Sequence, residues 1–176
     1  MKRGKEMTNA EKAKQYAVEK HKGQLHGTRP FMMHLNEVVG ALHEFGYLDD
    51  DLTAAAWLHD VVEDTPVEIE EIYEVFGERI GDLVDALTDG PGETRVEKKQ
   101  KPYATIPKVP GALLVKLADR IANVRRTIIE GKAADRYRET YKREHAGFCK
   151  ALGGTGEGRE MWDVLDNLLT GGLRGV

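Results

Sequence analysis

The sequence of 176 residues contains a single cysteine, Cys149, and no long apolar stretch. One cysteine excludes an internal disulfide, so no cysteine pattern points to an oxidising compartment. No segment approaches the roughly 18 apolar residues that cross a bilayer, and the lysine-rich N-terminus lacks the apolar segment of a secretory signal. We therefore expect a cytoplasmic protein with no membrane association.

The chain also lacks an excess of positive charge, internal repeats and low-complexity linkers. Its formal net charge of −4 argues against a nucleic-acid binder, which needs a basic face to displace counterions from phosphates. A small anionic substrate stays compatible with that charge, because a divalent metal can supply positive charge locally. Hydrophobic residues make up 40% of the chain and charged residues 32%, which is typical of a globular domain.

No segment alternates apolar and polar residues as a half-buried strand does, and glycine and proline fall between stretches with helical spacing. The predicted fold class is therefore all-α. We expect a single domain over residues 1–176, with a core at about 8–152 and a C-terminal helix at about 158–170. The first helix is predicted to begin at Thr8, because Thr8 and Glu11 have the spacing of a capping box.

The next helices are predicted from apolar spacing and from proline and glycine positions. The segment 89–110 is charged and contains several glycines and prolines, so it is predicted to be a mobile lid or surface loop. The predicted helices between the first and the last are one following Pro30, one from about Asp49 to just before Pro66, and others at 68–76, 80–87, 112–130 and 133–152.

The segment 54–65 places four ionisable residues in an otherwise apolar helix. His59 and Glu63 are four residues apart, and so are Asp60 and Asp64, so each pair would share a strip of helix surface. Burying such carboxylates costs on the order of several kcal/mol per ion unless a cation compensates, and a metal ion would do so. The alternative is an amphipathic helix that ends in water, with Glu63 and Asp64 solvated.

Two further segments carry polar residues in apolar surroundings. Asp119 and Asn123 lie four residues apart in the predicted helix 112–130, and His34 follows an apolar stretch after Pro30. Taken alone, Asp119 could equally pair with a neighbouring arginine, and His34 could be an ordinary core or surface histidine. The conjunction of the three segments favours a shared site.

These segments together resemble the HD-domain superfamily, and within it the hydrolase domain of RelA/SpoT-type enzymes and the small alarmone hydrolases. That family carries H-x-G-Q, then P-Y-I-x-H-P, then L-L-H-D-V-V-E-D-T, then K-L-A-D-R-x-x-N. The resemblance covers about residues 10 to 127. The matching segments here are His21–Gln24, Pro30–Leu35, Leu58–Thr65 and Lys116–Asn123.

The resemblance implies a helical HD-domain bundle that is a metal-dependent phosphohydrolase. Glu63 and Asp64 match the pair that orients or deprotonates the attacking water, and Asn123 matches a nucleotide-contacting residue. The ion in the family is typically Mn²⁺, and two nitrogen and two oxygen ligands with open positions suit a divalent ion of this kind. The four implied metal ligands are His34, His59, Asp60 and Asp119.

The resemblance further implies the 3′-pyrophosphohydrolase reaction on (p)ppGpp, which releases GDP or GTP and pyrophosphate. The family carries an arginine two positions after the glutamine of H-x-G-Q, where this chain has His26. His26 is expected to contact the substrate, and Arg29 and Lys22 are the candidates to replace the arginine's phosphate contact. The alternatives are an HD-domain phosphatase or nucleotidase acting on another phosphorylated metabolite, and a non-catalytic nucleotide sensor. Retention of Glu63 and Asp64 favours an enzyme, because a sensor need not keep them.

The C-terminal part carries aromatic and basic residues at near-helical spacing. Tyr137, Tyr141 and Phe148 are expected to pack on the core rather than to bind a base. The basic residues between 136 and 143 are expected to form a solvated helix face, with a phosphate-steering patch as the alternative.

Overall fold

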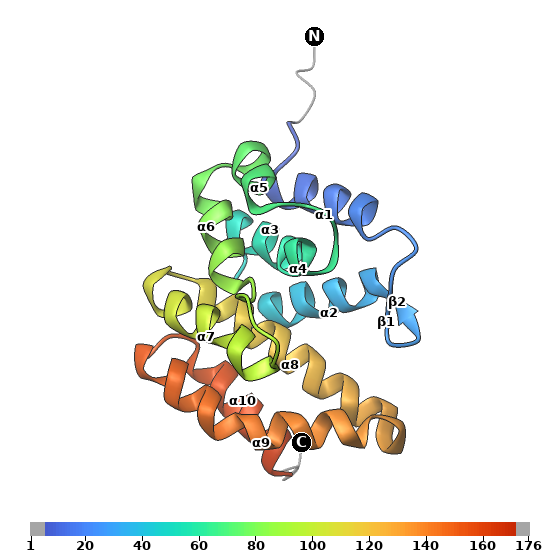
Figure 1. Ribbon diagram of the computed structural model, residues 1–176, viewed down its shortest axis with the longest axis vertical. Coiled ribbons are helices and arrows are strands. Elements are labelled where there is room, and N and C mark those ends of the chain that lie inside the picture. Colours follow the sequence, from blue (N-terminus) through green and yellow to red (C-terminus); the bar gives the residue numbers. More distant parts are fainter. Residues whose placement is uncertain (1–5, 172–176) are drawn as a thin grey trace.

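The computed structural model describes residues 6–171, and helices pack there on both sides of one long helix, α8 (Figure 1). The predicted all-α class is confirmed. The α-helices are α1 (Asn9–Lys20), α2 (Phe31–Glu44), α3 (Asp50–Leu58), α4 (Val61–Asp64), α5 (Ile69–Phe76), α6 (Glu78–Leu87), α7 (Arg95–Thr105), α8 (Ala112–Glu130), α9 (Asp135–Leu152) and α10 (Arg159–Thr170). Short strands β1 (Leu25–His26) and β2 (Arg29–Pro30) and the 3₁₀ turns η1 (Ile106–Lys108), η2 (Gly131–Ala134) and η3 (Gly153–Thr155) connect them.

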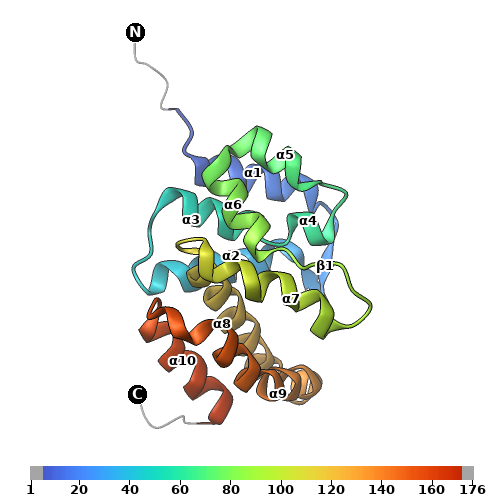
Figure 2. The same cartoon turned by 60° about the vertical axis from the view of Figure 1, so that its left-hand side comes forward.

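Helix α8 packs on α2, α3 and α6 on one side and on α9 and α10 on the other (Figures 1 and 2). Its residues facing both layers are buried, which explains the continuous apolar pattern of this segment. Helix α3 is the most enclosed, because every residue from Leu52 to Leu58 is buried. Small side chains let α1 pack against it, since Ala13 and Ala17 of α1 and Ala54–Ala56 of α3 are all fully buried.

The predicted ends of the first and last helices are confirmed. Thr8 Oγ1 accepts a hydrogen bond from the Glu11 amide at 3.2 Å, and the Glu11 carboxylate accepts one from the Thr8 amide at 3.0 Å. These two bonds satisfy N–H groups that have no partner within the helix. The predicted C-terminal helix is α10, which buries Met161 and Leu165 against the core.

The predicted uninterrupted helix from Asp49 to Pro66 is wrong. Helix α3 ends at Leu58, and α4 begins at Val61, with Asp60 between them at φ −102° and ψ −2°. Adjacent residues of a continuous helix point about 100° apart, whereas His59 and Asp60 both turn toward the same point in the structure. The break is therefore what brings these neighbouring side chains together.

The segment 89–110 is not the irregular loop or lid that was predicted, because it contains α7. Thr94 and Glu97 form a second capping box, with the same spacing as the one that begins α1. Lys99 and Lys101 then pair with Asp89 and Asp85 at 2.7 Å, which ties α7 to the end of α6. The glycines and prolines of this segment lie mostly outside α7, and the capping box is the sequence feature that indicates the helix.

A short antiparallel hairpin lies between α1 and α2. Leu25 pairs with Pro30 and His26 with Arg29, and Gly27 in the turn has φ +65°, a conformation that favours glycine. Strands of two residues are too short to produce the alternation that identifies a strand in sequence. The hairpin places His26 beside α2.

Within residues 6–171, no helix combines the length and the apolar character required to cross a membrane.

Candidate metal centre and adjoining pocket

The four residues expected to bind a metal meet at one place in the interior. His34 comes from α2, Asp119 from α8, and His59 and Asp60 from the break between α3 and α4. His34 Nε2 lies 3.4 Å from Asp60 Oδ2 and 3.5 Å from Asp119 Oδ1. His59 Nε2 lies 3.1 Å and 3.7 Å from the same two oxygens. We call these four residues the metal cluster.

The His59 ring is oriented by the backbone. Its Nδ1 donates a hydrogen bond to the carbonyl of Ala56 at 2.9 Å, so its Nε2 faces the carboxylates as an electron-pair donor. Within the described part of the chain this buried Nε2 has no hydrogen-bond partner of acceptable geometry. A buried nitrogen of this kind is costly unless something else binds it. A divalent cation fits the position.

The donor set also fits such an ion. His34, His59 and Asp119 each offer one ligand atom within 4.8 Å of the others, and the Asp60 carboxylate lies beside both rings. Two imidazole nitrogens with carboxylate oxygens suit divalent ions of the first transition row. The His34 and His59 side chains are only 3% exposed, so the site is shielded on the side of the core.

The charges in the metal cluster depend on one another. Burial alone would lower the pKa of His59, but the negative charges of Asp60 and Asp119 raise it well above its usual value. Burial would likewise raise the pKa of Asp60, yet the two imidazole rings hold it well below its usual range. A cluster of this kind attracts positive charge, which a bound divalent metal supplies.

Asp119 is held from two sides. Lys116 Nζ lies 3.0 Å from Oδ2, and the Asn123 amide donates to Oδ1 at 2.6 Å. Although burial disfavours a charged lysine, Asp119 and Asp60 raise the pKa of Lys116 above its usual value. These partners fix the orientation of the Asp119 carboxylate, as outer contacts of a metal ligand usually do.

Glu63 and Asp64 line the same cavity as His34, Asp60 and Asp119. Burial raises the pKa of each carboxyl, and the charge of Asp60 raises it further. Glu63 also accepts a hydrogen bond from the Asp89 amide at 2.8 Å, which holds it near the start of the α7 segment. Carboxylates with raised pKa values beside a metal cluster are suited to accept a proton from water.

The cavity over the metal cluster has a volume of about 320 Å³, and four cationic side chains contribute to its wall. Arg95 and Lys99 come from α7, and Lys116 and Arg120 come from α8. Sequence reasoning missed this role for all four. Arg95 and Lys99 lie four residues apart just after a capping box, so a helix prediction for α7 would have placed them on one face.

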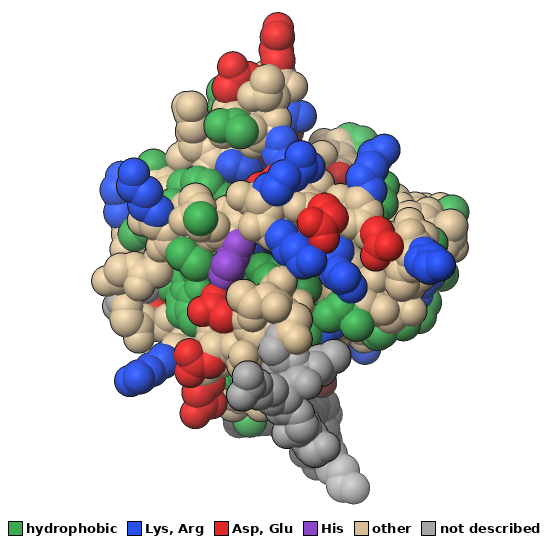
Figure 3. Space-filling model, turned by 90° about the horizontal axis from the view of Figure 1, so that it is seen from below, with side chains coloured by type: hydrophobic (Ala, Val, Ile, Leu, Met, Phe, Trp, Pro, Cys, Tyr) green, Lys and Arg blue, Asp and Glu red, His purple; other side chains and the backbone are tan. Residues whose placement is uncertain are grey.

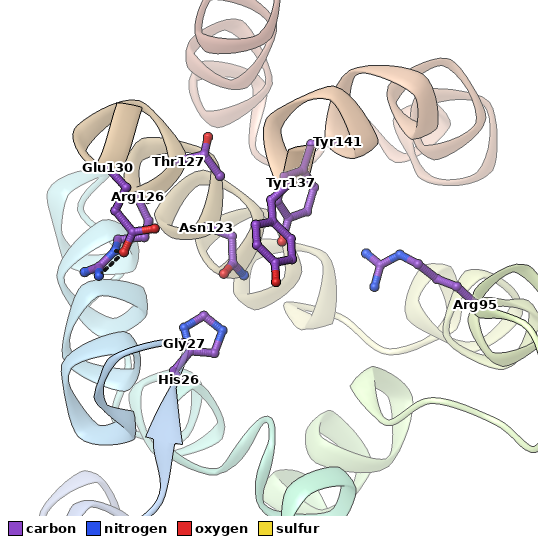
Figure 4. Close-up of a pocket in the computed structure, with 9 residues that line it drawn as sticks. All are labelled: His26, Gly27, Arg95, Asn123, Arg126, Thr127, Glu130, Tyr137 and Tyr141. Carbon is purple, nitrogen blue, oxygen red and sulfur yellow. Dashed lines mark hydrogen bonds and ion pairs between the residues drawn. The ribbon is translucent and has the colours of Figure 1, made fainter. Parts of the chain in front are cut away.

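A second cavity of about 270 Å³ adjoins the first, and His26, Arg95, Asn123 and Tyr141 belong to both walls. Figure 4 shows these side chains converging from the β1 turn, α7, α8 and α9. The wall of this second cavity, which we call the side pocket, is formed by His26, Gly27, Arg95, Asn123, Arg126, Thr127, Glu130, Tyr137 and Tyr141.

Two of the three aromatic residues of α9 pack on the core as expected: Phe148 is fully buried, and the partly buried Tyr141 packs against the core. Tyr137 is 58% exposed and lines the side pocket, and Tyr141 lines both cavities. The expectation is therefore wrong for Tyr137, which lies one turn before Tyr141 on α9.

The expected substrate contacts divide into two groups. His26 and Asn123 line both cavities, and the His26 ring stacks on His34 with centroids 4.5 Å apart. Arg29 instead pairs with Glu37 at 3.0 Å, and Lys22 is exposed. Among the described residues, neither Arg29 nor Lys22 belongs to the wall of either cavity.

Comparisons with known proteins agree with this arrangement. The family model described as "HD domain" matches residues 13–147. The chain is 33% identical over 173 residues to human guanosine-3′,5′-bis(diphosphate) 3′-pyrophosphohydrolase MESH1, covering 94% of this chain and 95% of that one. It is 38% identical over 122 residues to GTP pyrophosphokinase rsh of Brucella melitensis, covering 65% of this chain and 16% of that one.

A solved structure described as a metazoan orthologue of SpoT that hydrolyses ppGpp superposes with a TM-score of 0.78 at 26% identity. The superposition covers 97% of this chain and 99% of the other. The family match spans the metal cluster, Glu63, Asp64 and every residue of the side pocket. This chain therefore belongs to the HD domain family.

Proposed function

We propose that this protein is a metal-dependent hydrolase that removes the 3′-pyrophosphate of ppGpp or pppGpp, releasing GDP or GTP and pyrophosphate. The observation that carries the proposal is one cavity wall that combines three residues of the metal cluster, two carboxylates with raised pKa values and four cations. The similarity to the human 3′-pyrophosphohydrolase over nearly the whole of both chains supports the choice of substrate.

His34, His59, Asp60 and Asp119 are the proposed ligands of the ion, which we propose to be Mn²⁺. When bound, the ion lowers the pKa of a water molecule and polarises a phosphoryl oxygen. The ligands themselves are fixed by the Ala56 carbonyl, Lys116 and Asn123, so little reorganisation is needed when substrate enters.

In the proposed reaction, water attacks the phosphorus that is attached to the 3′ oxygen. Glu63, with Asp64 beside it, accepts the water proton as the new P–O bond forms. The bond from phosphorus to the 3′ oxygen breaks, and that oxygen takes up a proton to become the 3′ hydroxyl of GDP. Pyrophosphate leaves with the oxygen that came from water.

The cations of the cavity wall are placed to bind the pyrophosphate. Lys99 and Arg95 of α7 and Lys116 and Arg120 of α8 line the same cavity as the metal cluster carboxylates. Lys116 pairs with Asp119, and Lys99 pairs with Asp89. These ion pairs hold the two ammonium groups in place in the cavity wall. Charge-assisted hydrogen bonds to phosphate contribute about 1.5–3 kcal/mol each.

The side pocket is the proposed place of the guanosine. The Asn123 amide group already donates to Asp119, so its carbonyl oxygen stays available as an acceptor for the nucleotide. Tyr137 and Tyr141 offer aromatic surfaces for the base (Figure 4).

The core and α10 are proposed to form one domain, because α9 and α10 both pack on α8.

A substrate screen tests the proposal. Protein loaded with Mn²⁺ is incubated separately with ppGpp, pppGpp, nucleoside triphosphates, nucleoside monophosphates and NADPH, and the products are separated by ion-exchange chromatography. We expect GDP and pyrophosphate from ppGpp. If the protein hydrolysed another nucleotide and did not hydrolyse ppGpp, that nucleotide would be the substrate instead. The observation that favours this alternative is the ion pair between Arg29 and Glu37, which turns Arg29 away from the cavities.

The sensor alternative is tested in the same screen. A sensor would bind ppGpp in equilibrium dialysis and release no product, and Glu63→Gln would then leave its behaviour unchanged. An enzyme would lose turnover in Glu63→Gln while still binding ppGpp. The cytoplasmic location stays a prediction from the sequence.

A further inference from the structure

A second group of metal-binding side chains lies where α9 meets α10, and it shares no residue with the metal cluster or the side pocket. His145 Nε2 is 2.6 Å from Asp166 Oδ1 and 3.5 Å from Cys149 Sγ. One ligand atom from each residue lies within 4.8 Å of the others. We propose that His145, Cys149 and Asp166 form a second metal site, which binds a zinc-class ion and fastens α10 to α9.

The helices dictate this convergence. His145 and Cys149 are four residues apart on α9, so their side chains share one face of that helix. Asp166 is supplied by α10, which packs directly on α9. Two ligands at this spacing on one helix and a third from its neighbour are how proteins commonly hold a metal between helices.

The donor types select the ion. A thiol sulfur, an imidazole nitrogen and a carboxylate oxygen suit Zn²⁺ or Co²⁺. The metal cluster has no sulfur donor and suits a harder ion such as Mn²⁺. The two sites should therefore take up different metals from a mixture.

The distances fit a tetrahedral ion after one small change. Bonds of about 2.0–2.3 Å to zinc place neighbouring ligand atoms roughly 3.3–3.7 Å apart. The separation of Cys149 Sγ from His145 Nε2 already lies in this range. The His145–Asp166 distance is that of a hydrogen bond and must lengthen, which the Asp166 side chain can allow because it is 56% exposed.

The site is open to ions from solvent. The His145 side chain is 16% exposed, and Cys149 is partly buried. Figure 3 shows the face on the side of α9 and α10, on which basic, acidic and apolar side chains are mixed. With three protein ligands, the fourth position is left to water.

A bound ion would stabilise the wall of the side pocket. The residue before His145 is Glu144, which pairs with Arg95 and Arg120, and Tyr141 lies one turn earlier on the same helix. The contact between α9 and α10 otherwise includes the rings of Phe148 and Trp162, 5.2 Å apart. The ion would cross-link the two helices, so its effect should be on stability more than on chemistry.

Cobalt spectroscopy tests the site directly. Cys149 is the only cysteine of the chain, so a thiolate-to-cobalt charge-transfer band can come from this site alone. Metal-free protein, kept reduced with a phosphine, is titrated with Co²⁺. We expect the band to saturate at one equivalent, to be absent in Cys149→Ser and to persist in Asp119→Asn, which removes a ligand of the other site.

His145→Ala and Asp166→Asn show whether the three residues act together. Each should weaken cobalt binding by at least about tenfold, the lower end of what removal of even an outer partner of a metal site costs. An absent band in folded wild-type protein, or a band equally strong in both variants, would overturn the proposal and leave an ordinary His145–Asp166 hydrogen bond.

Zinc-dependent stability is the second measurement. Zn²⁺ at a hundredfold excess over its Kd should raise the thermal unfolding midpoint of the wild type by roughly 5–10 °C. To isolate this site, the comparison is made between Asp119→Asn and Asp119→Asn with Cys149→Ser. An equal rise in both proteins contradicts the proposal, and far-ultraviolet circular dichroism checks that both are folded.

Discussion

The metal cluster and the side pocket differ in burial. The His34 and His59 side chains of the metal cluster are 3% exposed and lie on or next to helices that contribute to the hydrophobic core. Arg95 and Tyr137 of the side pocket are more than half exposed. The metal cluster is fixed by packing from three directions. The side pocket is fixed by ion pairs, chiefly those that Glu144 of α9 makes with Arg95 of α7 and Arg120 of α8.

This difference in burial indicates that the metal cluster and the side pocket have different roles in the reaction. A closely packed interior deforms little, which suits ligands that must stay within a fraction of an ångström of their positions. Exposed side chains joined by ion pairs can adjust to the group that they bind. Substitutions in the metal cluster and at Glu63 should therefore act on kcat, and substitutions in the side pocket should act mainly on KM.

The largest effect is expected from loss of a metal ligand. Asp119→Asn should abolish binding of the proposed Mn²⁺ and lower kcat by about 10³-fold or more, since the ion supplies several kcal/mol of transition-state stabilisation. Elemental analysis and turnover of ppGpp measure the two quantities. Asp163→Asn on the exposed face of α10 is the matched control and should change neither. Full metal content in Asp119→Asn would show that the ion binds elsewhere.

The next effect concerns proton transfer. Glu63→Gln should lower kcat by roughly 10²–10⁴-fold and leave KM and metal content close to normal. The amide oxygen of glutamine can still accept the bond from the Asp89 amide, so the start of the α7 segment should keep its position. Asp64→Asn should act in the same direction, and the double variant should be less than additive. Near-normal rates in both single variants would move water activation to another group.

Arg95 and Arg29 provide a contrast between a cation in the pocket wall and one paired outside it. Arg95→Ala should raise KM for ppGpp by roughly ten- to a hundredfold, since a charged contact contributes about 1.5–3 kcal/mol. Arg29→Ala should change KM far less, because the Arg29 guanidinium pairs with Glu37. Steady-state kinetics of both variants decide this. A larger effect at Arg29 would mean that it leaves Glu37 to contact the substrate.

The smallest effect is expected from the ion pairs that hold the pocket wall. Burial would raise the pKa of Glu144, but Arg95 and Arg120 lower it below its usual value. A carboxyl with a lowered pKa adds stability above its unfolded pKa of about 4.3 and loses it as the pH falls through the folded value. Glu144→Gln should therefore lower the unfolding midpoint by roughly 2–4 °C at pH 7, for about 1 kcal/mol.

That difference between wild type and Glu144→Gln should shrink below about pH 4. Differential scanning calorimetry at several pH values measures it. Glu139→Gln, on an exposed turn of the same helix, is the control and should show little dependence on pH. A constant difference across the pH range would mean that Glu144 acts through packing alone.

The sequence by itself determined the local features of this protein. The capping box at Thr8, the apolar spacing of α8 and the ionisable residues within apolar segments each depend on neighbours in the chain, so they could be recognised without coordinates. The resemblance to the HD-domain superfamily implied which four of the ionisable residues bind a metal, and the structure brings their side chains together.

Only the tertiary structure decided how segments that are distant in the sequence are placed next to one another. The break between α3 and α4 at His59–Asp60 turns two adjacent side chains toward one point, and no signal in the neighbouring sequence marks it. Arg95 and Lys99 reach the cavity because α7 docks on α6, and Tyr137 lines the side pocket because α9 packs beside α8, which supplies other residues of its wall. Arg29 was the expected substitute for a phosphate contact, and Glu37, eight residues away, holds it instead. Ion pairs and docking of this kind depend on the packing of whole helices, which periodicity in the sequence does not encode.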